Sequence, residues 1–304
     1  MTSALHGQRL DKALVALAPE FSRSHLQHLV LRGHVGLDGV PAATASRRVR
    51  AGQRLTLELV PTDESRAYTP QPMPMAVLYE DEHLLVLDKP AGLVVHPAPG
   101  NWSGTLLNGL LARHAGAAAL PRAGIVHRLD KDTSGVMMVG KTLPAVTALV
   151  RDIAARHVHR RYLALAHGVT GADFSVDAPI GRDPRVRVRM AVVPVAAGGR
   201  AARTDVHRLA VAEADDGGEP VSALSCTLHS GRTHQIRVHL ASCGHPLLAD
   251  TLYGGRPALG MTRQALHATE LRLAHPVTRA PLAFECRPPA DFAAAWARVL
   301  GGAD

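Results

Sequence analysis

The chain has few cysteines, few lysines and no long apolar run, and these shortages exclude several classes of protein. Its 304 residues include three cysteines, which form neither a C-x-x-C pair nor an even disulfide set. No segment approaches the roughly 18 consecutive apolar residues of a membrane span. The first residues lack the basic and then apolar order of a signal peptide. We therefore expect a globular protein of the reducing cytoplasm that has no contact with a membrane.

Aromatic residues make up only 3% of the chain, which argues against a sheet whose rings stack on successive RNA bases. Positive charge is plentiful and comes almost entirely from arginine: 34 basic residues, of which four are lysine, stand against 26 acidic residues, a net charge of +8. A polyanionic partner is one explanation, and the codon bias of a GC-rich genome is the other. Codon bias does not explain why residues 1–60 alone carry eight basic and four acidic residues.

Periodicity divides the chain into two domains. Residues 9–33 predict two short helices, and short strands follow up to residue 60, so residues 1–60 form a small basic α/β domain. The segment 61–75 has four prolines and predicts a semi-rigid linker. Residues 76–304 mix strands and helices without regular alternation, which predicts a mixed α+β fold. Its expected strands are 77–79, 84–88, 135–141, 160–168, 205–212 and 221–229, and its expected helices are 105–116, 143–156, 233–242 and 290–299.

A dense polar run, HRLDKDTSG at residues 127–135, lies between two apolar segments. Polar loops between buried strands often carry catalytic groups. Arg128 and Lys131 favour the ionised form of Asp130 between them, which suits a nucleophile or a general base. An ordinary solvated turn is the alternative.

A second run, SGRTHQIRVHL at residues 230–240, predicts the start of a helix. Thr233 is a favourable N-cap, and Arg232 just before it can pair with a carboxylate or hold a phosphate. Ile236 is expected to pack inward, while Arg237 projects elsewhere. Three histidines of this region, spaced by five residues, do not share a helical face, so we expect no metal site.

A third run is rich in arginine. Residues 181–190 and 198–208 hold seven arginines against two aspartates. In a strand, Arg185, Arg187 and Arg189 alternate onto one face and form a track for a phosphate backbone. A solvated strand face is the alternative.

Taken together, these motifs resemble those of the RluA/RluD family of RNA pseudouridine synthases, in the family's order. The polar run resembles the family's signature motif. The other matching blocks are DKPAGLVVHP (88–97), RRYLALAHG (160–168), IGRDPRVRVRMAVV (180–193) and SGRTHQIRVHLASCGHPLLADTLYGG (230–255). Residues 9–60 resemble a small RNA-binding domain first known from a ribosomal protein. The resemblance covers nearly the whole chain and implies a mainly antiparallel catalytic sheet.

The resemblance also implies roles for single residues. Asp130 is similar to the family's essential aspartate, Tyr162 to the tyrosine that stacks on the bound base, and Arg232 to the arginine paired with the aspartate. Arg237 is a close alternative for that arginine. Ala249 stands where a glycine is common.

Substrate contacts are implied at further positions. Arg128 would enter the RNA helix in place of the extruded uridine, and Ile236 would form an apolar wall below the base. The remaining substrate-binding residues are expected to be His127, Arg187, Arg189 and, where it does not pair with Asp130, Arg237.

The implied reaction converts uridine to pseudouridine, in large-subunit ribosomal RNA or, as the other candidate, transfer RNA. Asp130 either attacks C1′ or removes the 2′ proton, and the sequence leaves both routes open. We expect a monomer without cofactor or metal. A kinase is excluded because the aspartate of HRLDKD falls one position late and no glycine-rich loop accompanies it. The other alternative is a non-catalytic RNA-binding or ribosome-assembly protein of the same fold, although such a chain should have lost Asp130, Tyr162 or Arg232.

Overall fold

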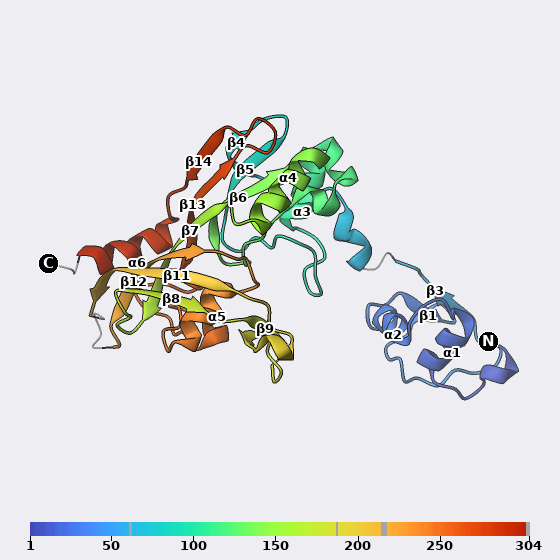
Figure 1. Ribbon diagram of the computed structural model, residues 1–304. Coiled ribbons are helices and arrows are strands. Elements are labelled where there is room, and N and C mark those ends of the chain that lie inside the picture. Colours follow the sequence, from blue (N-terminus) through green and yellow to red (C-terminus); the bar gives the residue numbers. More distant parts are fainter. Residues whose placement is uncertain (61–62, 187, 214–217, 302–304) are drawn as a thin grey trace. The chain divides into compact units, whose positions relative to one another are not determined.

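The computed structural model describes residues 1–60, 63–186, 188–213 and 218–301 (Figure 1). Its internal contacts form two compact units, Met1–Arg66 and Ala67–Asp304. The boundary lies within the segment 61–75 that was predicted to be a linker. The 3-10 helix η2 (Asp63–Tyr68) crosses this boundary. No helix in the described ranges is long and apolar enough to cross a bilayer.

The second half of the predicted linker packs on the larger unit. The side-chain amide of Asn108 donates to the carbonyl oxygens of Ala67 and Thr69 at 3.1 and 2.9 Å. The backbone N–H of Gly104 donates to the side chain of Gln71 at 2.6 Å. The larger unit therefore begins before residue 76, the position at which the sequence analysis expects it to start.

The smaller unit has two helices and a three-stranded sheet. Ser22 accepts a hydrogen bond from the backbone of His25 and caps the second helix, which ends before Gly33 at φ +82°. Asp11 is fully buried and accepts hydrogen bonds from Arg9, Arg23 and Gln27. The elements are η1 (Ser3–Leu5), α1 (Leu10–Leu17), α2 (Arg23–Leu31), β1 (Val35–Leu37), β2 (Val40–Pro41) and β3 (Leu55–Leu57), with strand order β2-β1-β3.

The larger unit is built on a sheet of nine strands among the described residues, in the order β4-β5-β6-β13-β7-β12-β11-β8, with β14 also pairing with β13. Its strands, together with the separate hairpin β9–β10, are β4 (Ala76–Glu80), β5 (Leu84–Lys89), β6 (Ser134–Gly140), β7 (His159–His167), β8 (Asp173–Asp177), β9 (Ile180–Arg182), β10 (Met190–Val192), β11 (Arg203–Ala212), β12 (Val221–Leu228), β13 (Leu266–Ala274) and β14 (Pro281–Glu285). Its helices are α3 (Leu106–Arg113), α4 (Leu143–Ala154), α5 (Gln235–Ser242) and α6 (Ala290–Gly301), with the short 3-10 helices η3 (Ala115–Ala119), η4 (Pro121–Gly124), η5 (Val195–Ala197) and η6 (Thr251–Tyr253).

The sheet is mainly antiparallel, and its one parallel pair in the described chain joins β6 to β13. Gly135 is required there, because it has φ +118° and an added Cβ would lie 2.2 Å from the carbonyl oxygen of Ala268. The mixed sheet confirms the predicted α+β class. The sequence analysis did not predict β8, β13 or β14.

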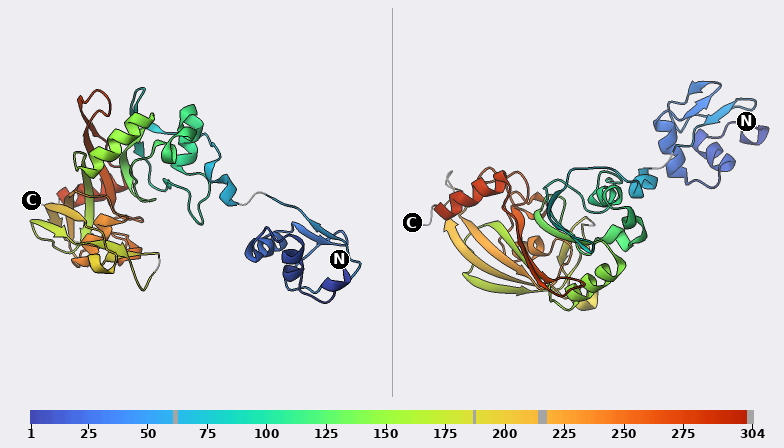
Figure 2. Two further views of the ribbon diagram at one scale, coloured as in Figure 1. Left: turned by 45° about the vertical axis from the view of Figure 1, so that its right-hand side comes forward. Right: turned by 90° about the horizontal axis from the view of Figure 1, so that it is seen from above.

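Side chains alternate along β7 and divide the core between the two faces of the sheet. Tyr162 and Ala164 belong to the main core with α3, α4 and α5, whereas Leu163 and Leu165 pack with α6. Figure 2 shows α6, in red, alongside the strands β11 and β12. The face of the sheet that carries α5 is the face on which the candidate site lies.

Candidate active site

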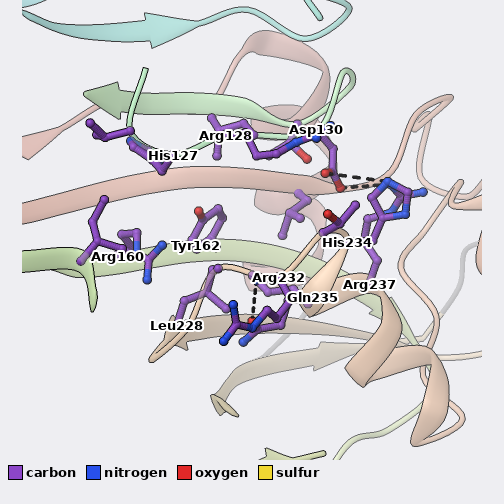
Figure 3. A pocket seen from close by; sticks show the side chains of 18 of the residues that line it. His127, Arg128, Asp130, Arg160, Tyr162, Leu228, Arg232, His234, Gln235 and Arg237 are labelled. Carbon is purple, nitrogen blue, oxygen red and sulfur yellow. Dashed lines mark hydrogen bonds and ion pairs between the residues drawn. The ribbon is translucent and has the colours of Figure 1, made fainter. Parts of the chain in front are cut away.

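A cavity of about 270 Å³ lies between the polar run 127–133, strand β7 and the start of α5. Figure 3 shows side chains from these three segments converging on it, with Asp130 at one end and His127 and Arg160 at the other. A second cavity of about 510 Å³ also includes Asp130. Asp130 therefore borders both cavities.

The backbone around Asp130 is held by a buried lysine. Lys89 is fully buried, and its ammonium donates to the carbonyl oxygens of Pro90, Leu93 and Lys131 at 2.8, 3.0 and 3.0 Å. Burial lowers the pKa of Lys89 to about 8. The carbonyl of Asp130 accepts the N–H of Thr133 at 3.1 Å. These hydrogen bonds therefore fix the backbone of the loop that carries Asp130, directly before β6.

The Asp130 carboxylate pairs with Arg237. Nη1 of Arg237 donates to Oδ2 of Asp130 at 3.0 Å, and Nε and Nη2 donate to the two carboxylate oxygens of Asp250 at 2.7 and 2.8 Å. The side chains of Arg237 and Asp250 are only 6% and 1% exposed. The two carboxylates raise the pKa of Arg237, although burial opposes the shift. Asp250 therefore fixes a guanidinium whose remaining nitrogen faces Asp130.

The prediction that Arg232 pairs with Asp130 is wrong. The side chain of Arg232 is exposed at the cavity, and its Nε donates to the carbonyl of Ala201 at 3.1 Å. The reason is the geometry of the helix start: α5 begins at Gln235, after His234 at φ +56°, and Thr233 does not cap it. This left-handed residue turns the chain, so that Arg237 faces Asp130 from the first turn of α5.

Two aromatic side chains support the ion pair. The guanidinium of Arg237 lies 5.0 Å from the centre of the Tyr253 ring. The Tyr253 hydroxyl accepts the N–H of Met190 at 3.0 Å and lies 2.8 Å from Nδ1 of His234. Burial lowers the pKa of His234, so we assign a neutral ring that accepts at Nδ1. The proton is then on Nε2, which lies 3.9 Å from Oδ1 of Asp130.

The walls of the 270 Å³ cavity include the expected tyrosine and isoleucine. Tyr162 is 5% exposed and Ile236 3% exposed. Burial raises the pKa of the Tyr162 phenol, so this ring is a neutral, flat surface at pH 7. His127 and Arg128 line the same cavity, and Arg128 also lines the second.

The arginine track has a different backbone from the predicted one. Arg185 and Arg189 do not lie in a strand but in the segment between β9 and β10, where the N–H of Asp183 donates to the carbonyl of Arg189. Alternation onto one face therefore does not apply. The Arg189 guanidinium lies 5.2 Å from the centre of the Tyr253 ring, next to the ion-pair cluster, and Arg187 lies outside the described residues.

Sequence reasoning missed several residues of the site: His96, Arg160, Asp250 and Tyr253. Only Arg160 had a usable signal, because it stands two positions before Tyr162 and so shares its face of β7. The described residues include no group of three or more His, Cys, Asp or Glu placed to hold a metal ion.

Comparison with known proteins agrees with this geometry. Residues 83–242 match the family described as RNA pseudouridylate synthase, and residues 8–55 match the S4 domain. The chain is 46% identical over 299 residues to ribosomal large subunit pseudouridine synthase D of Xanthomonas campestris, covering 94% of this chain and 87% of the relative. Its identity to the protein of the same name from Neisseria meningitidis is 44%, over 95% of this chain and 78% of the relative.

Among solved structures, human RNA pseudouridylate synthase domain containing 1 aligns with a TM-score of 0.57 and 26% identity, covering 73% of this chain and 88% of that chain. These similarities support the catalytic interpretation and not the alternative of a non-catalytic RNA-binding protein. The chain belongs to the RNA pseudouridylate synthase family, carries an S4 domain at its N-terminus, and is a pseudouridine synthase that acts on RNA.

Proposed function

We propose that this enzyme isomerises uridine in large-subunit ribosomal RNA. The support is the name shared by the Xanthomonas and Neisseria relatives, which match nearly the whole chain. The basic residues 1–60 and the arginines near the site suit a partner with a phosphate backbone. The cytoplasmic location and the monomeric state stay predictions from the sequence.

The observation that carries the proposed mechanism is the Asp130–Arg237–Asp250 arrangement beside a cavity lined by Tyr162. The reaction breaks the N1–C1′ bond, turns the base and joins C5 to C1′. Asp130 acts at the ribose, either by attack on C1′ or by removal of the 2′ proton. Arg237 orients the carboxylate through a charge-assisted hydrogen bond of 3.0 Å.

The cavity holds the base while it is detached. Tyr162 offers its ring for stacking, and Ile236 supplies an apolar wall. A base paired in RNA must first leave its stack, at a cost of a few kcal/mol. Arg128 is exposed at the rim of both cavities, and we assign it to the gap that the base leaves in the RNA stack.

The direct test is tritium release from 5-tritiated uridine in unmodified ribosomal RNA, because C5 loses its hydrogen when the new bond forms. The wild type should release tritium, and Asp130→Asn should be at least about 100-fold slower, since it loses the reacting carboxylate but keeps the shape. Release from transfer RNA alone would contradict the proposed substrate. Equal release by both proteins would contradict the role of Asp130.

We also propose that the S4 domain supplies docking and not chemistry. A chain that begins at Ala67 keeps the contacts of Asn108 with Ala67 and Thr69, so it retains the larger unit. We expect this shortened chain to have a raised KM for intact ribosomal RNA and an unchanged kcat. Full activity on intact RNA at moderate salt would show that docking does not depend on the S4 domain.

A further inference from the structure

The end of the 270 Å³ cavity away from Asp130 contains a buried cation that has no partner within the described part of the chain. Arg160 is 6% exposed, and its side chain makes no hydrogen bond or ion pair with another described residue. Its Nε is completely buried. A buried guanidinium without an acceptor costs folding free energy, so its place in a cavity points to a ligand that supplies the acceptor.

A second unpaired donor lies at the same end. Nε2 of His127 accepts the backbone N–H of Met138 at 3.0 Å, so in the neutral ring the proton is on Nδ1. Nδ1 is buried and has no partner among the described residues. Burial, together with the charge of Arg160, lowers the pKa of His127 to about 3. The ring is therefore a neutral donor at pH 7.

Local structure makes room for these donors. Arg160 and Tyr162 lie two positions apart on β7 and share one face of the strand. Gly231 leaves space for the guanidinium, because an added Cβ there would lie 2.8 Å from Nη1 of Arg160. In Figure 3 the Tyr162 ring lies between Asp130 on one side and Arg160 with His127 on the other.

This order defines which edge of a base meets the donors. With the ribose at Asp130 and the ring stacked on Tyr162, N1 of uracil faces Asp130. The ring atom opposite N1 is C4, so its carbonyl oxygen O4 points to the far end. We propose that Arg160 and His127 form a carbonyl-binding subsite that receives O4 of the target uridine and, after the base has turned, O2.

The same donors suit both stages of the reaction. C5 must take the place of N1, and a half-turn about the axis through N3 and C6 achieves this. That half-turn exchanges C4 with C2, so O2 arrives where O4 was. Cytosine carries an amino donor at C4, which two hydrogen-bond donors reject.

Charge balance also favours this subsite. When the N1–C1′ bond breaks, N1 keeps the electron pair, and the detached uracil is an anion whose charge is shared by O2 and O4. The ribose carbon either bonds to Asp130 or forms a double bond to C2′ as the 2′ proton leaves. A fixed guanidinium and an N–H directed at the carbonyl stabilise that developing charge. Arg160 is then a catalytic residue that touches the reacting base.

The test combines a substitution in the protein with a single-atom change in the RNA. It rests on the proposed function in one respect, because it needs an RNA that the enzyme modifies. A fragment that contains a modified uridine is prepared with oxygen, with sulfur at C4, or with sulfur at C2 of that nucleotide. Single-turnover tritium release from C5 is measured at saturating protein for wild type, Arg160→Met and Arg160→Lys. Arg161→Met is the matched control, because Arg161 lies on the other face of β7 and pairs with Glu270.

We expect sulfur at C4 to slow the wild type by about 10-fold or more, since sulfur accepts a hydrogen bond from a charged donor poorly. Arg160→Met should be about 10- to 100-fold slower on the oxygen RNA and insensitive to sulfur at C4. Arg160→Lys should recover part of the rate, because it keeps the charge but not the planar fork. Arg161→Met should match the wild type in rate and in sensitivity to sulfur. Sulfur at C2 should also slow the wild type and not Arg160→Met.

Two results would overturn the proposal. One is that sulfur slows Arg160→Met by the same factor as it slows the wild type, so that the two effects multiply. Arg160 and the substituted carbonyl would then act independently. The other is that Arg160→Met weakens RNA binding alone and leaves the saturated rate unchanged, as a phosphate contact would. If Arg160→Met does not fold, the slowing by sulfur is compared in the same way between Arg160→Lys and the wild type. Failure of the wild type on ribosomal RNA contradicts the proposed substrate instead, and the comparison is then made on the RNA that it does modify.

Discussion

The assignment of Arg237, and not Arg232, as the partner of Asp130 can be tested with two matched changes. Arg237→Gln removes three hydrogen bonds and leaves Asp250 buried without a counter-charge. Breaking a buried pair in this way costs about 3–5 kcal/mol. For a unit of this size each kcal/mol lowers the melting temperature by roughly 2–4 °C, so a loss of about 4 kcal/mol predicts a fall of roughly 8–16 °C. Arg232→Gln changes an exposed side chain and should cost less than about 0.5 kcal/mol.

Activity should separate the two arginines in the same way. Without Arg237 the Asp130 carboxylate loses its orientation, and we expect kcat to fall at least about 100-fold. Arg232→Gln should raise the KM for RNA and leave kcat unchanged, because among the described residues its side chain hydrogen-bonds only to the carbonyl of Ala201 and lies exposed at the cavity. Calorimetry gives the melting temperature, and tritium release at saturating RNA gives kcat.

A double variant distinguishes catalysis from folding. Arg237→Gln combined with Asp250→Asn removes the unpaired buried charge, so it should recover at least half of the lost stability while kcat stays low. The assignment would be refuted if Arg232→Gln lowered kcat as strongly as Arg237→Gln, or if the double variant recovered activity together with stability.

Two further predictions concern stability alone. Ala249 has φ +56°, a conformation that costs an alanine about 1–2 kcal/mol, whereas glycine loses about 0.4–1 kcal/mol through its more flexible unfolded chain. The change also removes a buried methyl group, at a cost of about 0.8 kcal/mol. Ala249→Gly should therefore leave the free energy of unfolding in urea within about 1 kcal/mol of the wild type, and a larger decrease would contradict this account. Burial opposes ionisation of Asp81, but hydrogen bonds from Tyr79, from the backbone of His83 and Leu84, and from His275 outweigh it and lower its pKa to about 2. Because the folded pKa lies below the ordinary value of 3.8, about 2 kcal/mol of stability is present above pH 4 and lost as the pH falls toward 2. Asp81→Asn should lose less free energy of unfolding than the wild type between pH 6 and pH 3, and equal losses would exclude this role for Asp81.

Local patterns were sufficient to predict most elements of the larger unit. Helix α4 is an amphipathic stretch, and β6 is a short apolar run next to glycine, so neighbouring residues carry the whole signal. Strand β13 was missed although it lies near the centre of the sheet between β6 and β7. Its sequence, LHATELRLA, contains Glu270, a buried carboxylate that pairs with Arg161 of β7. Burial of that charge depends on a partner more than 100 positions away, which a local pattern does not contain.

The sequence by itself determined the motifs, the carboxylate at Asp130, the ring at Tyr162 and the family that these residues resemble. The tertiary structure decided which arginine meets Asp130, because a single left-handed residue, His234, sets the start of α5 and so the direction of Arg237. It also brought Asp250 to that arginine and left Nε of Arg160 and Nδ1 of His127 without hydrogen-bond partners among the described residues at the far end of the cavity. Residue types and their order along the chain set the chemistry that is available. Distances and unpaired donors arise only when the strands β6, β7 and β13 and helix α5 pack together.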